Sequence, residues 1–258
     1  MDKLVNDLAI VRRLEAMAFR AWPAASVHYD GSWQIRQTAG HPSKRINSVN
    51  PLDPSDHMDI EKRIESAARR FKAYNRPLVF RQSPLAPPQL DSYLDARGWI
   101  RFDDSIVLMA DLTAMNLDDA VDMLPVKDIG WFVDAVIDVQ GRDGLFKAGL
   151  SEVISSIKQK NALFVLEDKE IGAVSTVLCV HDTEFAGLLD LGTRADCRRQ
   201  GHARNILKSA FLWARYNGAQ KIWLQVVKQN RGAIALYKGL GFEEVYRYSY
   251  RKQPEHEL

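Results

Sequence analysis

The sequence of 258 residues predicts a mixed α/β fold, in which a mostly antiparallel sheet is flanked by helices. Three observations support this prediction. Segments with helical periodicity alternate with short apolar strands, several neighbouring strands are separated only by turns, and the order of elements near the N-terminus returns near the C-terminus. The composition, with 46% hydrophobic and 26% charged residues, is that of an ordinary globular protein.

Charge, cysteine content and hydropathy exclude several classes of function. A net charge of +2 is too small to favour nucleic acid, and the basic residues gather between 194 and 208. Cys179 and Cys197 form neither a disulfide framework nor a metal-ligand pattern, so we expect no metal and a cytoplasmic location. No apolar run reaches about 18 residues, and the N-terminus has no long apolar core. We therefore expect neither a membrane partner nor secretion.

The N-terminal part of the chain predicts helices and short strands in alternation. Apolar periodicity predicts a helix over 4–21, and alternating residues predict paired strands at 32–38 and 45–49. A start rich in Asp and Ser predicts the next helix, followed by the strand PLVFRQ. Another helix is expected to stop at Gly98, before the strand SIVLMADL.

The C-terminal part predicts two helices followed by a hairpin. The helices are expected over roughly 126–139 and 145–160, broken by the turn GRDG. The segments ALFVLED and IGAVSTVLCVHD predict a hairpin, and TEFAGLLDLGT continues it antiparallel as a strand that ends at Thr193.

A basic loop, RRQGHA, follows this strand and opens a helix at Gly201. A helix start gathers free backbone N–H groups and the positive end of the helix dipole around one point. Gly201 lets the backbone approach an anion, Ala203 leaves room beside it, and Arg198, Arg199 and Arg204 add positive charge. We predict a phosphate or pyrophosphate site. The loop lacks the Lys-Ser/Thr pair of a P-loop and the three glycines of a dinucleotide fold.

The pattern Arg198-x-x-Gly201-x-Ala203 resembles the acyl-coenzyme A loop of the GNAT superfamily of N-acyltransferases. Downstream, the segment KIWLQVVKQNRGAIALYKGLGF resembles the second signature of the family, and the match covers roughly 115–250. In the family, strand 4 splays from strand 5 and its backbone holds the pantetheine and the thioester oxygen. The resemblance implies acetyl-CoA as cosubstrate, bound by Leu191, Thr193, Arg198, Arg199, Gln200, Gly201, His202, Ala203, Arg204 and Asn230.

The N-terminal half resembles a degenerate copy of the same fold. Aligning LDSYLDARGWIRFDD with AIALYKGLGFEEVY matches Gly98 with Gly241 and places Leu94 where Tyr237 stands. We therefore expect a degenerate GNAT-like domain at 1–112 and a catalytic domain at 113–258, in a tandem arrangement similar to mycothiol synthase-like proteins. The N-terminal copy has NPLDPSDHMD in place of the basic loop, so we expect one acyl-CoA site. Coincidence of a common βαβ pattern is the alternative.

Amide formation needs a base for the amine and a proton for the leaving thiolate. The resemblance implies that Tyr237 is the proton donor; the alternative is a half-buried core tyrosine. Asp190 is the first candidate for the base and Glu184 the second, although either could be an exposed or hairpin-pairing carboxylate. In enzymes that acetylate ribosomal-protein N-termini, a glutamate often stands at the position of Gln225, whose neutral amide cannot take a proton.

The sequence therefore predicts transfer of an acetyl group from acetyl-CoA to a primary amine of a small molecule, by direct attack in a ternary complex of a monomer or homodimer. In the family, helices at 126–160 border the acceptor, and the candidates for acceptor contacts are Trp131, Phe132, Arg142 and Asp143. Packing or a solvated turn is the alternative for each. The other functions considered are a protein or peptide N-terminal acetyltransferase, a non-catalytic acyl-CoA binding module, and an acyltransferase with a longer acyl or aminoacyl donor. Tyr237 and the carboxylates favour an enzyme.

Overall fold

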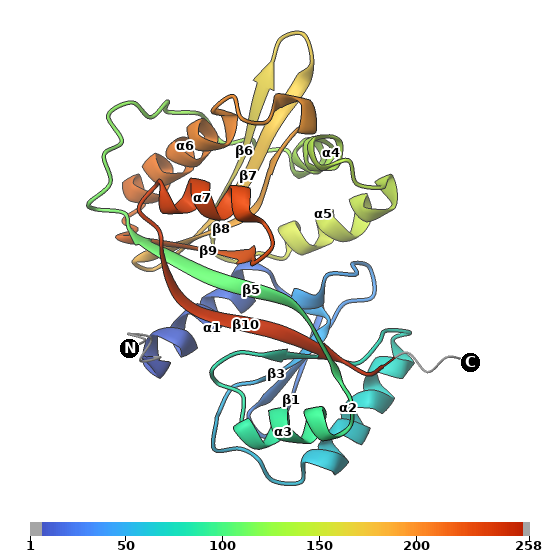
Figure 1. Ribbon diagram of the computed structural model, residues 1–258. Helices are drawn as coiled ribbons and strands as arrows, with labels where there is room; N and C mark the ends of the chain where they lie inside the picture. Colours follow the sequence, from blue (N-terminus) through green and yellow to red (C-terminus); the bar gives the residue numbers. More distant parts are fainter. Residues whose placement is uncertain (1–6, 255–258) are drawn as a thin grey trace. The chain divides into compact units, whose positions relative to one another are not determined.

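The computed structural model describes residues 7–254 and divides them into two compact units (Figure 1). The first unit contains the described residues up to Val107, the segment Val226–Asn230 and the described residues from Val245 onward. The second unit contains Leu108–Gln225 and Arg231–Glu244. The mixed α/β fold with mostly antiparallel strands is confirmed.

The first unit contains a sheet with the strand order β1-β2-β3-β4-β10, in which β3 and β4 are parallel and the other pairs are antiparallel. The first helix begins at Leu8, where Asp7 accepts the N–H of Ala9 at 3.0 Å; Leu4, which the sequence placed in this helix, lies outside the described residues. The elements are α1 (Leu8–Ala21), β1 (Ser26–Asp30), β2 (Trp33–Gln37), η1 (Lys44–Ile46), β3 (Ser48–Pro51), α2 (Ile60–Ala73), β4 (Val79–Gln82), α3 (Pro88–Ala96), β5 (Ile100–Asp111), which ends in the second unit, and β10 (Glu243–Lys252), which begins in the second unit.

Two kinds of packing hold the first unit together. An apolar core lies under α2 and α3, where the ring of Phe80 contacts those of Trp33 and Trp99 edge-on at 5.4 and 5.6 Å. A buried ion pair joins Arg81 of β4 to Glu15 of α1, and Tyr246 of β10 donates its hydroxyl to the same glutamate. The C-terminal strand is thus fixed to the first unit by polar as well as backbone contacts.

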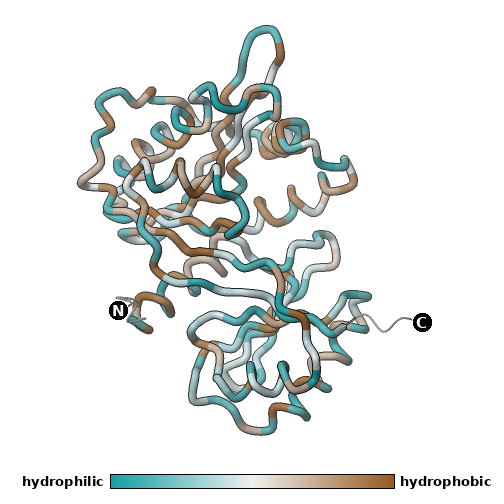
Figure 2. Tube along the Cα trace, in the orientation of Figure 1, coloured by the Kyte–Doolittle hydropathy of each residue, from teal (hydrophilic) through white to brown (hydrophobic). Residues whose placement is uncertain are grey.

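The second unit contains a sheet with the strand order β9-β8-β7-β6. The pairs β6–β7 and β7–β8 are antiparallel and β8–β9 is parallel, while α4 and α6 both pack against β7. Hydrophobic residues run along the middle of β7 and β8 (Figure 2). The elements are α4 (Ile129–Gln140), η2 (Gly144–Phe146), α5 (Lys147–Ser155), β6 (Lys160–Asp168), β7 (Gly172–Asp182), β8 (Phe185–Thr193), η3 (Ala195–Cys197), α6 (His202–Tyr216), β9 (Lys221–Val227) and α7 (Arg231–Lys238).

The two halves of the sequence repeat the same turn at matching positions. Gly98 and Gly241 both adopt left-handed backbone angles, with φ of +70° and +87°. The next residues, Trp99 and Phe242, each donate a backbone N–H over 3.0 Å to the carbonyl five positions earlier. The same hydrogen bond also ends other helices, at Arg142 and Ala219, so the internal repeat stays a prediction.

Candidate active site

The basic loop joins β8 to α6 within the second unit. Gly201 is the N-cap of α6 with φ of +89°, and the first backbone hydrogen bond of the helix runs from Asn205 N–H to Gly201 O at 3.0 Å. The N–H groups of the first turn therefore have no partner inside the helix. A Cβ added to Gly201 would meet no atom within 4 Å, so the space beside these donors is open.

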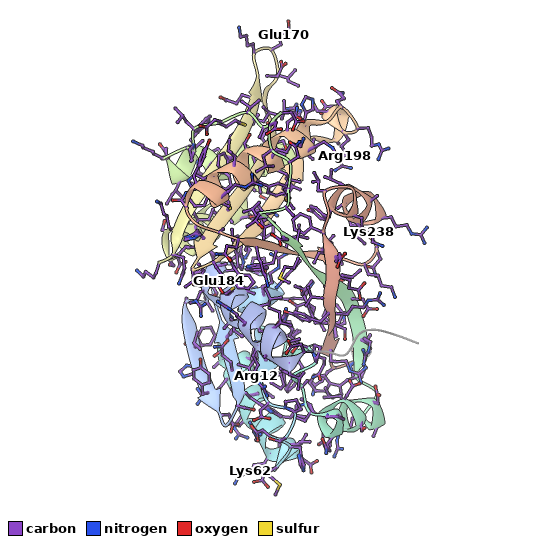
Figure 3. The ribbon with its side chains drawn as sticks, turned by 90° about the vertical axis from the view of Figure 1, so that its left-hand side faces the viewer. Arg12, Lys62, Glu170, Glu184, Arg198 and Lys238 are labelled. Atoms are coloured by element: carbon purple, nitrogen blue, oxygen red, sulfur yellow. The ribbon has the colours of Figure 1, made fainter. Side chains whose placement is uncertain are left out.

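The side chains of this loop are exposed and mostly basic. Figure 3 labels Arg198 on the loop, and its Nε–H donates to the carbonyl of Thr193 at 3.4 Å. Arg199 adopts φ of +64°, while His202 Nε2 lies 3.3 Å from the side-chain oxygen of Gln200. Exposed positive charge and open N–H groups at one helix start fit a pyrophosphate.

Cys197 lies buried within the loop. Desolvation, together with the hydrogen bond and negative charge of Asp196, raises the pKa of its thiol. A thiol held in its neutral form is a poor nucleophile, so the loop is suited to binding rather than to covalent chemistry.

The strands beside the loop separate at the expected place. β8 and β9 pair in parallel from Phe185↔Lys221 to Leu188↔Leu224, and no later residue of β8 pairs with β9 among those the structure describes. β8 continues beside β7 to Thr193. Leu191 and Thr193, both half-buried, therefore lie on the part of β8 that has left β9.

A bulge interrupts β8 in this separated part. The register changes between the pairs Leu178↔Leu189 and Thr176↔Gly192, so two residues of β8 face one residue of β7. The first residue of the bulge, Asp190, adopts φ of +48°.

Asp190 is held by the last residue of α4 and by a residue just after it. Arg142 Nη2 donates to Asp190 Oδ1 at 2.9 Å, and Gln140 Nε2 donates to the Asp190 carbonyl at 3.3 Å. The second carboxylate oxygen, Oδ2, is buried and has no hydrogen-bond partner within the described residues. Glu184, the second candidate for the base, precedes β8 at the other end of the strand, about 20 Å of extended chain from Asp190.

Tyr237 lies on α7, where its side chain is 6% exposed and its ring centroid is 5.8 Å from that of Phe242. Asn230 belongs to the turn before α7, where its N–H donates to the Val227 carbonyl at 2.9 Å. Gln225 is half-buried on β9. Burial of Tyr237 fits a packing role and a shielded proton donor equally well.

The candidates for acceptor contacts separate into different environments. Phe132 is fully buried in the core, which argues against contact with an acceptor, whereas Trp131 is 42% exposed. Asp143 caps η2 by accepting the N–H of Leu145 at 2.9 Å. The hydrogen bond from Gln140 to the Asp190 carbonyl was not predicted from the sequence. The only signal was the position of Gln140 just before a helix-ending glycine.

The described residues contain neither a cluster of metal ligands nor a helix that could span a membrane. Within residues 7–254, no group of three or more His, Cys, Asp or Glu side chains is arranged to hold a metal ion. None of the helices that the structure describes is long and apolar enough to cross a membrane.

Comparison with known proteins identifies the family. Residues 9–251 match the family described as "Probable histone acetyltransferase Rv0428c C-terminal". The chain is 24% identical to an uncharacterized N-acetyltransferase, YobR, of Bacillus subtilis, over 93% of this chain and 98% of that protein.

Two solved structures share the fold. A GCN5-related N-acetyltransferase from Kribbella flavida has a TM-score of 0.68 and 16% identity, with 98% of each chain covered. A tandem GNAT protein from the clavulanic acid biosynthesis pathway has a TM-score of 0.65 and 12% identity, over 95% of this chain and 89% of that one. The chain therefore belongs to this acetyltransferase family, and it shares the fold of the GNAT N-acetyltransferases.

Proposed function

We propose that the second unit binds one acetyl-CoA and transfers its acetyl group to a primary amine. The observation that carries this proposal is the start of α6, where the N–H groups of the first turn have no partner inside the helix, the space beside Gly201 is open, and Arg198 and Arg199 are exposed. Arg204 lies instead beside Gly239. This loop lies next to the part of β8 that has separated from β9. A pyrophosphate at the helix start and a pantetheine along β8 match these two features.

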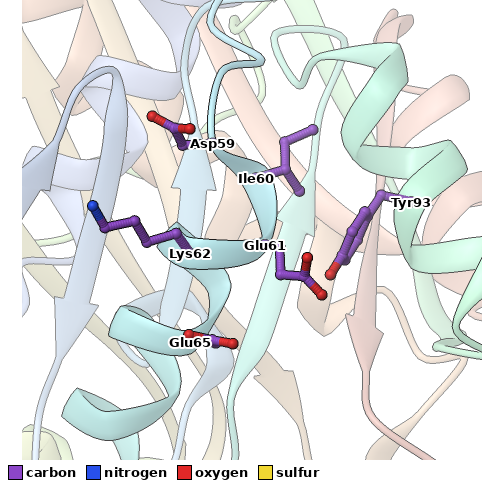
Figure 4. Close-up of a pocket in the computed structure, with 6 residues that line it drawn as sticks. All are labelled: Asp59, Ile60, Glu61, Lys62, Glu65 and Tyr93. Carbon is purple, nitrogen blue, oxygen red and sulfur yellow. The ribbon is translucent and has the colours of Figure 1, made fainter.

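The first unit offers no equivalent anion site at its corresponding helix. The N-cap of α2 is Asp59, with φ of +51°, in place of a glycine. A surface pocket of about 520 Å³ beside this helix is lined by three carboxylates, of Asp59, Glu61 and Glu65, and by one cation, Lys62. The Glu61 carboxylate faces the Tyr93 hydroxyl (Figure 4). Carboxylates would repel a phosphate here. One acetyl-CoA per chain follows.

The chemical roles follow from position. Acetyl-CoA supplies the activated acetyl group, and the backbone of β8 at Leu191 and Thr193 would hold its pantetheine and thioester. Tyr237 would protonate the departing thiolate; a phenol with a pKa of about 10 in water suits a thiolate of about 8.5–9. Asp190 as the base stays a prediction: one oxygen is paired with Arg142 and the other is buried, so it would act through water.

Calorimetric titration with acetyl-CoA tests the cofactor site. Wild-type protein should bind one equivalent per chain. Gly201→Asp should abolish binding, because the new carboxylate would project into the open space beside the helix start and repel the pyrophosphate. Gly218→Asp is the matched control, since Gly218 follows the other end of α6 with a similar φ of +92° and equally open surroundings. Two equivalent sites, or equal loss in both variants, would contradict the proposal.

We propose a small primary amine as the acceptor. Gln225 on β9 gives no carboxylate where ribosomal-type enzymes often have one, and one tandem structural neighbour is described as part of the clavulanic acid pathway. The rival acceptor is a protein lysine or N-terminus, which the histone acetyltransferase description of the family suggests.

Competition between acceptors decides this question. Acetylation should be followed by CoA release and product mass over a panel of amines, amino acids, polyamines, histone-tail peptides and ribosomal-type N-terminal peptides. We expect a small amine to have the highest kcat/KM. A peptide preferred far above every small amine would contradict this acceptor class while leaving the acetyl-CoA site intact.

A further inference from the structure

We propose that Arg142 and Gln140 are positioning residues that clamp the bulge of β8 in the shape needed to hold the thioester. The proposal rests on the proposed function, because it concerns the part of β8 expected to meet the acetyl group. We call Gln140, Arg142 and Asp190 the bulge clamp.

The bulge needs support because its backbone is strained. Asp190 has φ of +48°, a left-handed conformation that is unfavourable for an L-residue, although Asp tolerates it better than most. Such a conformation persists only when the surrounding contacts over-determine it. A bulge also leaves backbone groups outside the regular ladder, where they are available to another partner.

The clamp holds both the side chain and the backbone of Asp190. Arg142 binds the carboxylate at 2.9 Å, and the carbonyl accepts from Gln140 Nε2 at 3.3 Å and Thr176 Oγ1 at 3.4 Å. The side chain of Asp190 is only 11% exposed, so the ion pair is largely shielded from solvent. These contacts reach the residue from α4 on one side and β7 on the other.

The end of α4 delivers both clamp residues. Gln140 is the last residue of the helix, Gly141 ends it with φ of +59°, and Arg142 N–H donates to the Ile137 carbonyl at 3.0 Å. Gly192 gives Gln140 room on the strand, because a Cβ there would lie 2.7 Å from Gln140 Cγ. The contact depends on the absence of a side chain at position 192.

The position of the clamp explains what it would do. Asp190 directly precedes Leu191, on the part of β8 that has left β9. The backbone conformation of Asp190 therefore sets the direction of the backbone N–H and carbonyl groups of the residues after it. Donors fixed before the reaction stabilise developing charge on an oxygen without reorganisation. The clamp would therefore lower the activation barrier of acetyl transfer while adding little to the affinity for CoA.

The test uses acetyl-CoA labelled with ¹³C at the thioester carbonyl, bound to wild type, Arg142→Met, Gln140→Met and Lys147→Met. Lys147→Met is the control, because it breaks another ion pair of α4, with Asp134, on the exposed surface. In wild type, a hydrogen bond to the carbonyl should move its ¹³C signal downfield from that of free acetyl-CoA. In both clamp variants the signal should return toward the free value, and in the control it should not.

Binding and turnover complete the test. The affinity for acetyl-CoA should stay within about threefold in both clamp variants, since the phosphate loop is unchanged. With the best amine of the panel, kcat should fall about 10²-fold, the effect of a misplacement near 1 Å. Arg142→Lys keeps a positive charge at this position and should recover part of the downfield ¹³C shift and part of kcat.

Two failures are distinguishable. If wild type binds no acetyl-CoA, the proposed function is wrong. If wild type binds it with a shifted carbonyl signal, and Arg142→Met and Gln140→Met keep that signal and the wild-type kcat, the clamp is overturned while the function stands.

Discussion

Tyr237 combines packing with proposed chemistry at the scale of one residue. Its side chain is 6% exposed and its ring lies against Phe242, so removing only the hydroxyl should leave the packing unchanged. The same removal takes away the proposed proton donor. Removing this hydroxyl alone therefore distinguishes a packing role from a role as proton donor.

Tyr237→Phe should lower kcat at least ~10-fold with little change in the affinity for CoA, since a general acid contributes ~10²–10⁴-fold. Steady-state kinetics and calorimetry measure the two quantities. Tyr216→Phe is the control, because Tyr216 ends α6 and is 70% exposed. Unchanged turnover with chemistry as the limiting step would assign Tyr237 to the core.

The basic loop at the start of α6 could be singled out from the sequence because its residues are neighbours in the chain, and phosphate binding there stays a prediction. Glycine, arginines and a helix start within a few residues define a place for an anion. The partners of Asp190 could not be predicted: Arg142 is 48 residues away, and neither residue type requires the other. The left-handed backbone at Asp190 also gave no signal, because glycine is the residue that marks such positions.

At the scale of elements, the acidic loop before α2 is held by hydrogen bonds to two neighbouring segments of the first unit. Asp56 accepts the N–H and hydroxyl of Ser32 at 2.8 and 2.7 Å, and Arg63 Nη1 donates to it at 2.9 Å. Burial opposes ionisation, but the hydrogen bonds from Arg63 and Ser32 outweigh it and lower the pKa of Asp56 to about 2. The acidic loop is thus tied to the β1–β2 turn and to α2.

Asp56→Asn should destabilise β2 and α2 by about 1.5–3 kcal/mol at pH 6, the range for hydrogen bonds to a charged group. Because the folded pKa lies below the ordinary value of about 3.9, this stabilisation is complete above pH 5 and is lost as the pH falls through 2. Amide hydrogen exchange of β2 and α2 between pH 2 and 6 measures it, with Glu65→Gln on exposed α2 surface as control. If the difference in exchange between wild type and Asp56→Asn did not change with pH, the stabilisation could not come from the ionised Asp56 carboxylate.

The elements with strong periodicity were predicted, and those at the sheet edges were not. The helix expected over 126–139 is Ile129–Gln140, and the hairpin is β6–β7. β1 was missed because an edge strand is largely exposed and carries little apolar signal. β10 was missed because its buried positions are tyrosines, serine and arginine rather than aliphatic residues.

On the scale of the whole molecule, the two units are not consecutive segments of the chain, because the C-terminal strand belongs to the first unit. The sequence predicted a first domain at 1–112, yet Ser249–Lys252 pair with β4 and belong to the first unit. Tyr246, Tyr248 and Tyr250 are buried there, and Arg251 pairs with Asp95. A periodicity argument cannot reveal which strand a terminal segment will join.

A chain that stops after Glu244 should lose the fold of the first unit. Three buried tyrosines are removed, and at about 3 kcal/mol or more each their loss is comparable to the stability of a domain, about 5–15 kcal/mol. Hydrogen exchange of β3 and β4 should rise toward unfolded rates, whereas a chain that stops after Pro254 should match the full-length protein. Retained protection in the shorter chain would show that β10 is dispensable.

The hydroxyl of Tyr246 meets Glu15 across 231 positions of sequence, and this distance has a consequence for biosynthesis. Protein synthesis usually lets N-terminal domains fold first. Here the second unit is complete once Glu244 has left the ribosome, whereas the first must wait for the final strand. During translation β4 remains an open sheet edge until Val245–Lys252 has been made, and an open edge is prone to pair with other chains.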